Sequence, residues 1–105
     1  PIQSCQTYIQ QHLGEKLSMK ILSRISGYTP HYLAARFKEE TGQSVKHYIT
    51  EQKLEAARLL LKNSSLDMAE ISERLNFTNP SYFSAIFKKR TGCTPSEYRE
   101  AEDRH

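Results

Sequence analysis

Residues 80–98 of this chain read P-S-Y-F-S-A-I-F-K-K-R-T-G-C-T-P-S-E-Y, and residues 30–48 read P-H-Y-L-A-A-R-F-K-E-E-T-G-Q-S-V-K-H-Y. At a constant offset of 50 residues the two stretches share these identities: Pro30/Pro80, Tyr32/Tyr82, Ala35/Ala85, Phe37/Phe87, Lys38/Lys88, Thr41/Thr91, Gly42/Gly92 and Tyr48/Tyr98. Internal similarity at a fixed offset indicates that one structural unit is used twice. Whatever surface that unit presents is therefore presented twice.

The similarity continues upstream at an offset of 49 residues. The paired positions there are Leu17/Leu66, Met19/Met68, Ser23/Ser72 and Tyr28/Phe77. One residue has thus been inserted in the second copy, where Thr78-Asn79 stands in place of Thr29 alone. Turns accept insertions more easily than helices do, so we expect a turn at this position.

Each copy is predicted to contain a short helix, a tight turn and a longer second helix. Thr29 and Asn79 each precede a proline, a favoured helix start because the first helical N–H has no partner within the helix. Gly42 and Gly92 supply the left-handed residue that ends the second helix. A short helix, a turn and a longer helix form the helix-turn-helix, whose second helix enters the major groove of DNA.

The rest of the chain also has helical periodicity. Apolar residues recur at steps of three and four over residues 2–13, which predicts an amphipathic helix ending at Gly14. Ile25 is expected on the inward face of the short helix of the first copy. In the second copy, Asp67 and Glu70 have the spacing of a capping box.

The predicted fold is all-α, with about seven helices and no strand. We expect a first helix-turn-helix subdomain at residues 1–44, a long linker helix at 45–62 and a second helix-turn-helix subdomain at 63–105. The linker helix follows Ser44, and a last helix follows Thr94-Pro95, which Glu97 completes as a capping box.

Composition is compatible with a small globular DNA-binding domain. The chain has 105 residues, 37% of them hydrophobic and 26% charged, and a net charge of +3. No apolar run approaches the roughly 20 residues that a membrane helix needs, so no membrane partner is expected. Pro1 and the lack of a signal peptide suggest a fragment of a longer protein. Cys5 and Cys93 lack disulfide or zinc spacing, which fits a reducing cytoplasm.

The outward faces of the two second helices are the predicted DNA-binding surface. Small and polar side chains there suit base edges and thymine methyl groups, and basic side chains suit phosphates. The base-facing candidates are His31, Ala34, Ala35, Asn79, Ser81, Ser84 and Ala85. The phosphate-contact candidates are Tyr32, Arg36, Lys38, Tyr82, Lys88 and Lys89.

Several of these residues have a second interpretation. His31 could be a solvated residue at a helix start, and Lys38 and Lys88 could be ordinary surface charges. Tyr32 and Tyr82 are expected mainly to pack at the turn, with phosphate contact as a second role. The stem of Arg36 is expected to pack while its head reaches outward.

These motifs resemble the DNA-binding domain of AraC/XylS-type bacterial transcription regulators. The resemblance runs from about Ile9 to Arg99 and rests on G-Y-T-P-x-Y-L-x-x-x-F-K-x-x-T-G from Gly27, Y-I-x-x-x-K-L-x-x-A-x-x-L-L from Tyr48 and N-F-x-x-x-S-Y-F-x-x-x-F-K-K-x-T-G-x-T-P-x-x-Y-R from Asn76. It implies two helix-turn-helix subdomains on one linker helix, reading adjacent major-groove segments. It also implies a bacterial, cytoplasmic regulator, with activation among its modes of action.

The chain departs from this family's pattern at three places. Asn76 stands where the family usually has Gly, and asparagine tolerates a left-handed turn. Lys53, a further phosphate candidate, stands where the linker helix usually has Arg. Alanines at positions 34, 35 and 85 replace the long base-reading side chains of many members, so readout could lean on methyl contacts, water and DNA shape.

The expected partner is a double-stranded DNA operator, with RNA polymerase and an absent effector-binding or regulatory domain as further candidates. The four histidines have no metal-ligand spacing and the serines no nucleophile motif, so we expect no catalytic residue, no metal and no cofactor. Two alternatives remain open. They are a nonspecific architectural DNA binder and a helical protein-interaction module.

Overall fold

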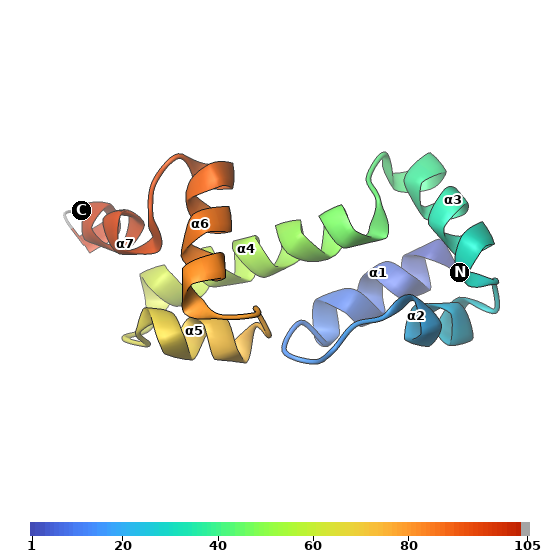
Figure 1. The fold of residues 1–105 in the computed structure, drawn as a ribbon, viewed down its shortest axis with the longest axis horizontal. Coiled ribbons are helices and arrows are strands. Elements are labelled where there is room, and N and C mark those ends of the chain that lie inside the picture. Colours follow the sequence, from blue (N-terminus) through green and yellow to red (C-terminus); the bar gives the residue numbers. More distant parts are fainter. Residues whose placement is uncertain (104–105) are drawn as a thin grey trace. The chain divides into compact units, whose positions relative to one another are not determined.

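The computed structural model describes residues 1–103, and over these residues the fold is all-α (Figure 1). The helices are α1 (Ile2–Gln11), α2 (Met19–Ser26), α3 (Pro30–Thr41), α4 (Val45–Asn63), α5 (Met68–Arg74), α6 (Pro80–Thr91) and α7 (Pro95–Asp103). This confirms the predicted fold class of about seven helices. The chain forms two compact units, Pro1–Gln52 and a second unit that begins at Lys53, so the boundary falls inside α4.

In the first unit, α1, α2, α3 and the start of α4 surround one hydrophobic core. Its buried members are Ile2, Cys5, Ile9, Leu22, Leu33, Phe37, Val45 and Tyr48. The ring of Tyr48 meets the ring of Phe37 edge-to-face, with centroids 5.4 Å apart, and its hydroxyl accepts a 2.9 Å hydrogen bond from Gln10 Nε2. Burial raises the pKa of the Cys5 thiol, which donates to the Leu22 carbonyl over 3.6 Å.

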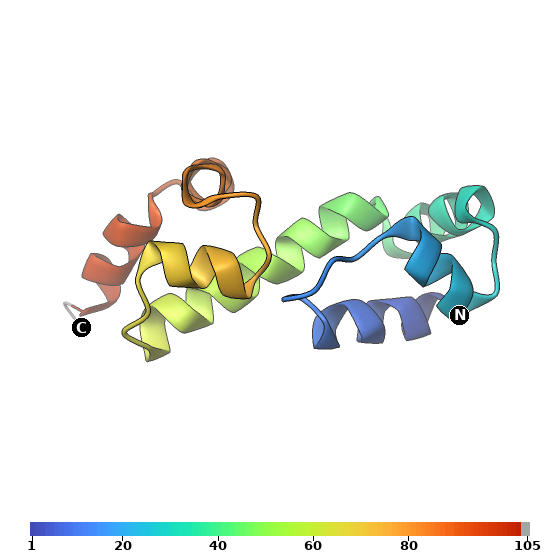
Figure 2. The same ribbon diagram turned by 60° about the horizontal axis from the view of Figure 1, so that its bottom comes forward.

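The second unit repeats this core. Buried apolar residues there are Leu54, Ala57, Leu61, Ile71, Leu75, Phe83, Phe87 and Pro95. Phe87 and Tyr98 meet edge-to-face with centroids 5.6 Å apart, as Phe37 and Tyr48 do in the first unit. In Figure 2 α6 is seen nearly end-on, with α5 beside it. The identities at these four aromatic positions thus preserve one packing contact that each unit needs.

The predicted helix caps are present in both units. The side-chain oxygens of Thr29 and Asn79 accept hydrogen bonds from the backbone N–H of the third residue of each helix, Tyr32 and Tyr82. Gly42 and Gly92 end these helices at φ values of 80° and 91°. The capping boxes also form at Asp67 and Glu70, and at Thr94 and Glu97. The backbone and hydroxyl of Thr94 lower the pKa of the Glu97 carboxyl by hydrogen bonding to it.

Two details of the first unit differ from the prediction. Helix α1 ends at Gln11 rather than at Gly14, because His12 stacks on Tyr8 and its Nδ1 lies 2.8 Å from the Tyr8 carbonyl oxygen. His12 Nδ1 therefore occupies the Tyr8 carbonyl oxygen, which would accept the backbone N–H of His12 if the helix continued. Ile25 is 39% exposed and not inward, since it lines an open depression together with the polar face of α1.

Candidate nucleic-acid interface

The turn of the first helix-turn-helix follows α2 directly. Gly27 is left-handed at φ 79°, and its N–H bonds to the Ser23 carbonyl oxygen. The Ser23 hydroxyl donates to the Tyr28 carbonyl, and Tyr28 N–H donates to Ser26 Oγ over 3.1 Å. The ring of Tyr28 meets that of Tyr32 edge-to-face at 4.9 Å. These contacts fix the direction in which the chain enters α3.

The turn of the second helix-turn-helix is built at equivalent positions. Asn76 is left-handed at φ 53°, as expected for the residue that replaces Gly27 in this copy. Phe77 N–H donates to the Ser72 carbonyl over 2.9 Å, and Ser72 is itself buried. The Phe77 ring lies 4.9 Å from the ring of Phe83 and 6.4 Å from that of Tyr82. An aromatic residue therefore closes the turn in both units.

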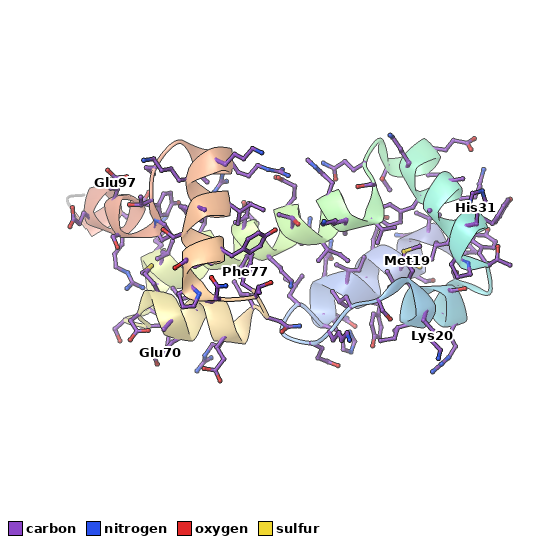
Figure 3. The ribbon with its side chains drawn as sticks, in the orientation of Figure 1. Met19, Lys20, His31, Glu70, Phe77 and Glu97 are labelled. Carbon is purple, nitrogen blue, oxygen red and sulfur yellow. The ribbon has the colours of Figure 1, made fainter. Side chains whose placement is uncertain are left out.

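Lys53 reaches this second turn from α4. Its Nζ donates to the Asn76 carbonyl over 3.0 Å and lies 5.4 Å from the centroid of Phe77, the labelled ring in Figure 3. Burial lowers the pKa of the Lys53 ammonium. The ammonium thus supports the turn from within its unit. A phosphate contact by Lys53 stays a prediction.

On α3 the predicted groove face is exposed. Leu33 and Phe37 are fully buried, whereas the side chains on the opposite side of the helix lie open to solvent. Those exposed residues are His31, Tyr32, Ala34, Ala35 and Lys38. Figure 3 places His31 at the first turn of the helix. The exposed face of α3 has small side chains in its middle, so the floor of a DNA groove could approach the backbone of the helix closely.

On α6 the corresponding face has the same character. Phe83 and Phe87 are fully buried, and Ser84 is partly buried. The exposed predicted residues are Asn79, Ser81, Tyr82, Ala85, Lys88 and Lys89. Asn79 Oδ1 accepts the capping hydrogen bond from Tyr82 N–H at 2.7 Å. A base contact by Asn79 would therefore use its side-chain amide nitrogen, Nδ2.

The head of Arg36 is paired on its own helix, and a phosphate contact by Arg36 stays a prediction. Its guanidinium nitrogens lie 3.6 Å from Glu39 and 3.4 Å from Glu40, both on the same helix. Its Nε is buried and has no hydrogen-bond partner. Sequence reasoning overlooked these acidic partners, although an Arg followed by Glu at three and four residues is a known helical ion-pair spacing.

Within the described residues, no His, Cys, Asp and Glu side chains gather as a metal-binding group. Nor does any described helix have the length and apolarity to span a membrane. Each unit has an exposed second helix that packs against a shorter helix and carries small, polar and basic side chains. These two features define a double helix-turn-helix DNA-binding domain.

Comparison with known proteins agrees with this class. A family model described as a helix-turn-helix domain matches residues 22–101. The chain is 40% identical over 92 residues to the HTH-type transcriptional regulator YobQ of Bacillus subtilis, covering 88% of this chain and 38% of that protein. It is 33% identical over 92 residues to the HTH-type transcriptional activator RhaR of Yersinia pseudotuberculosis, covering 88% of this chain and 32% of that protein.

Solved structures share the fold. The C-terminal domain of AraT, a response regulator from Geobacillus stearothermophilus, matches with a TM-score of 0.89 at 33% identity, covering 95% of this chain and 84% of that one. The DNA-binding domain of AdpA, solved with a target DNA, matches in fold with a TM-score of 0.91 at 24% identity, covering 96% of this chain and 91% of that one.

The chain belongs to the AraC-type family of helix-turn-helix domains. This confirms the family that the motifs indicated. It is a DNA-binding domain of transcription regulation and not an enzyme. The chain spans 38% of the length of YobQ and 32% of the length of RhaR.

Proposed function

We propose that the domain recognises a double-stranded DNA operator by placing α3 and α6 in two adjacent major-groove segments. The observation that carries this proposal is the exposure of the same helix face in both units. On that face the side chains are short where a base edge would lie and basic near the helix end. A shallow face allows a helix to sit deep in the groove, and terminal lysines suit the flanking phosphates.

Base recognition is assigned to the first turns and the middle of the outward faces of both helices. His31 on α3 and Ser81 and Ser84 on α6 offer hydrogen-bonding groups, while the alanines at 34, 35 and 85 offer methyl contacts to thymine. With so few long polar side chains, the domain would also depend on water-mediated contacts and on DNA shape.

Phosphate contact is assigned to Lys38, Lys88 and Lys89, with the hydroxyls of Tyr32 and Tyr82 in a secondary role. These side chains are exposed, and none of the three lysines lies on a buried face. The expected spacing of the two read segments is about one turn of DNA, as for paired half-sites of helix-turn-helix proteins.

The full-length protein would add partners to this domain. RhaR is named a transcriptional activator and AraT a response regulator, so we propose that a regulatory domain controls this one and that RNA polymerase is a partner at the promoter. A cytoplasmic location in a bacterial cell is part of the same proposal.

The test is selection of bound duplexes from a random DNA library by the purified domain at near-physiological salt, followed by sequencing. Two information-rich blocks about ten base pairs apart are expected. A single block would restrict base reading to one unit. Salt-sensitive binding without enrichment would favour the architectural alternative. No binding to any duplex would overturn the proposal and favour a protein-interaction module.

A further inference from the structure

The residue that caps the start of α6 has a side-chain amide whose orientation is fixed by the cap. Asn79 has an extended backbone, and its side chain accepts a hydrogen bond from the backbone N–H of Tyr82. The distance between the two atoms is 2.7 Å. A backbone N–H can only donate, so the atom that faces it is the amide oxygen Oδ1 and not the amide nitrogen. The hydrogen bond therefore decides which end of the amide lies against the helix.

The other end of the same amide is available to a ligand. Asn79 is exposed, and among the described residues no protein group accepts a hydrogen bond from its Nδ2. An amide nitrogen carries two donor hydrogens and cannot accept. The start of α6 thus presents a side-chain group that can only donate.

The equivalent cap of the first unit leaves a different group available. Thr29 caps α3 through Oγ1, which accepts from the backbone N–H of Tyr32 over 3.3 Å. A hydroxyl that has accepted one hydrogen bond can still accept a second and donate one. Thr29 therefore has no fixed polarity toward a ligand, whereas Asn79 is a donor. The two copies share the cap but differ in what the cap residue can offer to DNA.

We propose that Asn79 reads one base of the operator through Nδ2 and selects there against cytosine. The N-terminal residues of a recognition helix are those that contact base edges in helix-turn-helix complexes. In the major groove guanine, adenine and thymine all offer acceptor atoms, whereas cytosine offers only its N4 donor. A side chain that can only donate finds no partner on cytosine. This inference rests on the proposed function, because it assumes that α6 enters the major groove.

The cap also excludes the usual pairing of asparagine with adenine. That pairing is bidentate, because the amide oxygen accepts from adenine N6 while the amide nitrogen donates to N7. In Asn79 the oxygen lies against the N–H of Tyr82, so only the nitrogen faces a base. Adenine should therefore have no advantage over guanine at the position that Asn79 reads.

The experiment measures the affinity of the 105-residue chain for duplexes that carry each of the four bases at every position of the selected operator. In the original chain, one position should disfavour cytosine by about tenfold, as expected for a single base contact. Asn79→Asp keeps an oxygen for the cap, since aspartate caps helices about as well as asparagine, but replaces the Nδ2 donor with an acceptor. This variant should retain its unfolding midpoint and prefer cytosine at the same position.

Asn79→Thr provides a second arm of the test. It installs the cap residue of the first unit, whose hydroxyl lies nearer to the backbone than Nδ2 does. The cap should persist, so the variant should remain folded. The preference against cytosine should largely disappear at the one position, while the preferences at all other positions stay unchanged.

Thr78→Asp is the matched control, because it adds the same charge at the exposed residue before the cap. It should weaken binding to all duplexes and leave the ranking of bases unchanged. The same ranking in Asn79→Asp as in the original chain would overturn the inference, since Nδ2 would then donate to a phosphate or to water. A shift toward cytosine in Thr78→Asp would overturn it as well. If the original chain selects no sequence, the proposed function itself fails, which separates the two failures.

Discussion

The Nζ of Lys53 donates a hydrogen bond to the backbone carbonyl of Asn76 over 3.0 Å and thereby joins α4 to the turn between α5 and α6. The two residues are 23 positions apart in the chain. The turn needs support because Asn76 has a left-handed backbone, which side-chain-bearing residues rarely adopt. The linker helix therefore helps to fix the geometry of the second helix-turn-helix.

The partly buried ammonium of Lys53 predicts a pH dependence of stability. Burial lowers the folded-state pKa of Lys53 below its usual 10.5, so the unfolded chain binds this proton more tightly. The free energy of unfolding should rise with pH from the folded pKa of Lys53 to about 10.5, and Lys53→Met should remove this contribution. Urea denaturation at a series of alkaline pH values measures the difference between the two proteins.

Lys62→Met is the matched control, since Lys62 is exposed on the same helix. Other lysines and tyrosines titrate in all three proteins, and the comparison removes their contribution. Parallel pH curves for Lys53→Met and the original chain would contradict the assignment of this effect to Lys53.

The backbone of Asn76 supports a second prediction. Asn76→Ala should lower the free energy of unfolding by about 1 kcal/mol, because alanine tolerates the left-handed region less well than asparagine. Asn76→Gly should change it by less than about 1 kcal/mol, since relief of backbone strain is offset by greater freedom of the unfolded chain. Chemical denaturation with both variants measures these changes.

Gly27 gives the comparison in the first unit. Its φ is 79° and a Cβ there would meet no atom within 4 Å, so Gly27→Ala tests the backbone conformation alone. Its loss should be about 1–2 kcal/mol and exceed that of Asn76→Ala. An unchanged free energy of unfolding in both alanine variants would show that the left-handed turns do not limit stability.

Local sequence signals predicted most of the helix boundaries. Proline after Thr29 and Asn79, and glycine at 42 and 92, act through backbone geometry within a few residues, which is why they could be read directly. The outward position of Ile25 was also encoded in the repeat, because its equivalent in the second copy is Arg74, an exposed residue. Comparison of the two copies would therefore have predicted that Ile25 is exposed.

Contacts between distant residues could not be predicted in the same way. The bond from Lys53 to Asn76 depends on the packing of α4 against the second unit, and no periodicity contains that information. The partners of Arg36 were missed for another reason. Helix-face geometry gives the direction of a stem, but the ion pairs with Glu39 and Glu40 decide where the head lies.

A third prediction concerns Arg99, which caps the end of α4. Its guanidinium donates to the carbonyls of Leu61 at 3.1 Å, Ser64 at 3.2 Å and Leu60 at 3.5 Å. Arg99→Gln should lower the free energy of unfolding by about 1.5–3 kcal/mol, because the last carbonyls of the helix lose a charged donor. Arg99→Lys should recover only part of this loss since lysine lacks the planar fork.

Thermal and urea unfolding measure both Arg99 variants. Arg90→Gln is not a suitable reference because that residue belongs to the DNA-binding helix. Lys62→Gln, an exposed change near the same helix end, is the better one. If Arg99→Lys retained full stability, charge alone and not the fork would account for the cap.

The equivalent lysines of the repeat supply the fourth prediction. Lys38→Ala and Lys88→Ala should each weaken binding to all duplexes and flatten the salt slope by about one unit, because each removes one phosphate contact. Titration of a fixed and a random duplex at several salt concentrations measures both quantities. Lys16→Ala, an exposed lysine between α1 and α2, is the control for general charge. An unchanged slope in both variants would contradict the phosphate assignment.

Base reading should respond differently from phosphate contact. His31→Ala and Ser84→Ala remove groups on the predicted groove faces of α3 and α6, so they should change the ranking of selected operators more than the affinity for random DNA. A lost base contact is worth about 1–3 kcal/mol at one base pair, which is roughly 5-fold to more than 100-fold in preference there. Competition among single-base variants of the selected operator measures this preference.

Ser96→Ala, an exposed serine on α7, should leave the ranking unchanged. A uniform loss across all duplexes, with ranking preserved, would move His31 or Ser84 from the base-reading set to the backbone-contact set, since only contacts to base edges distinguish one sequence from another.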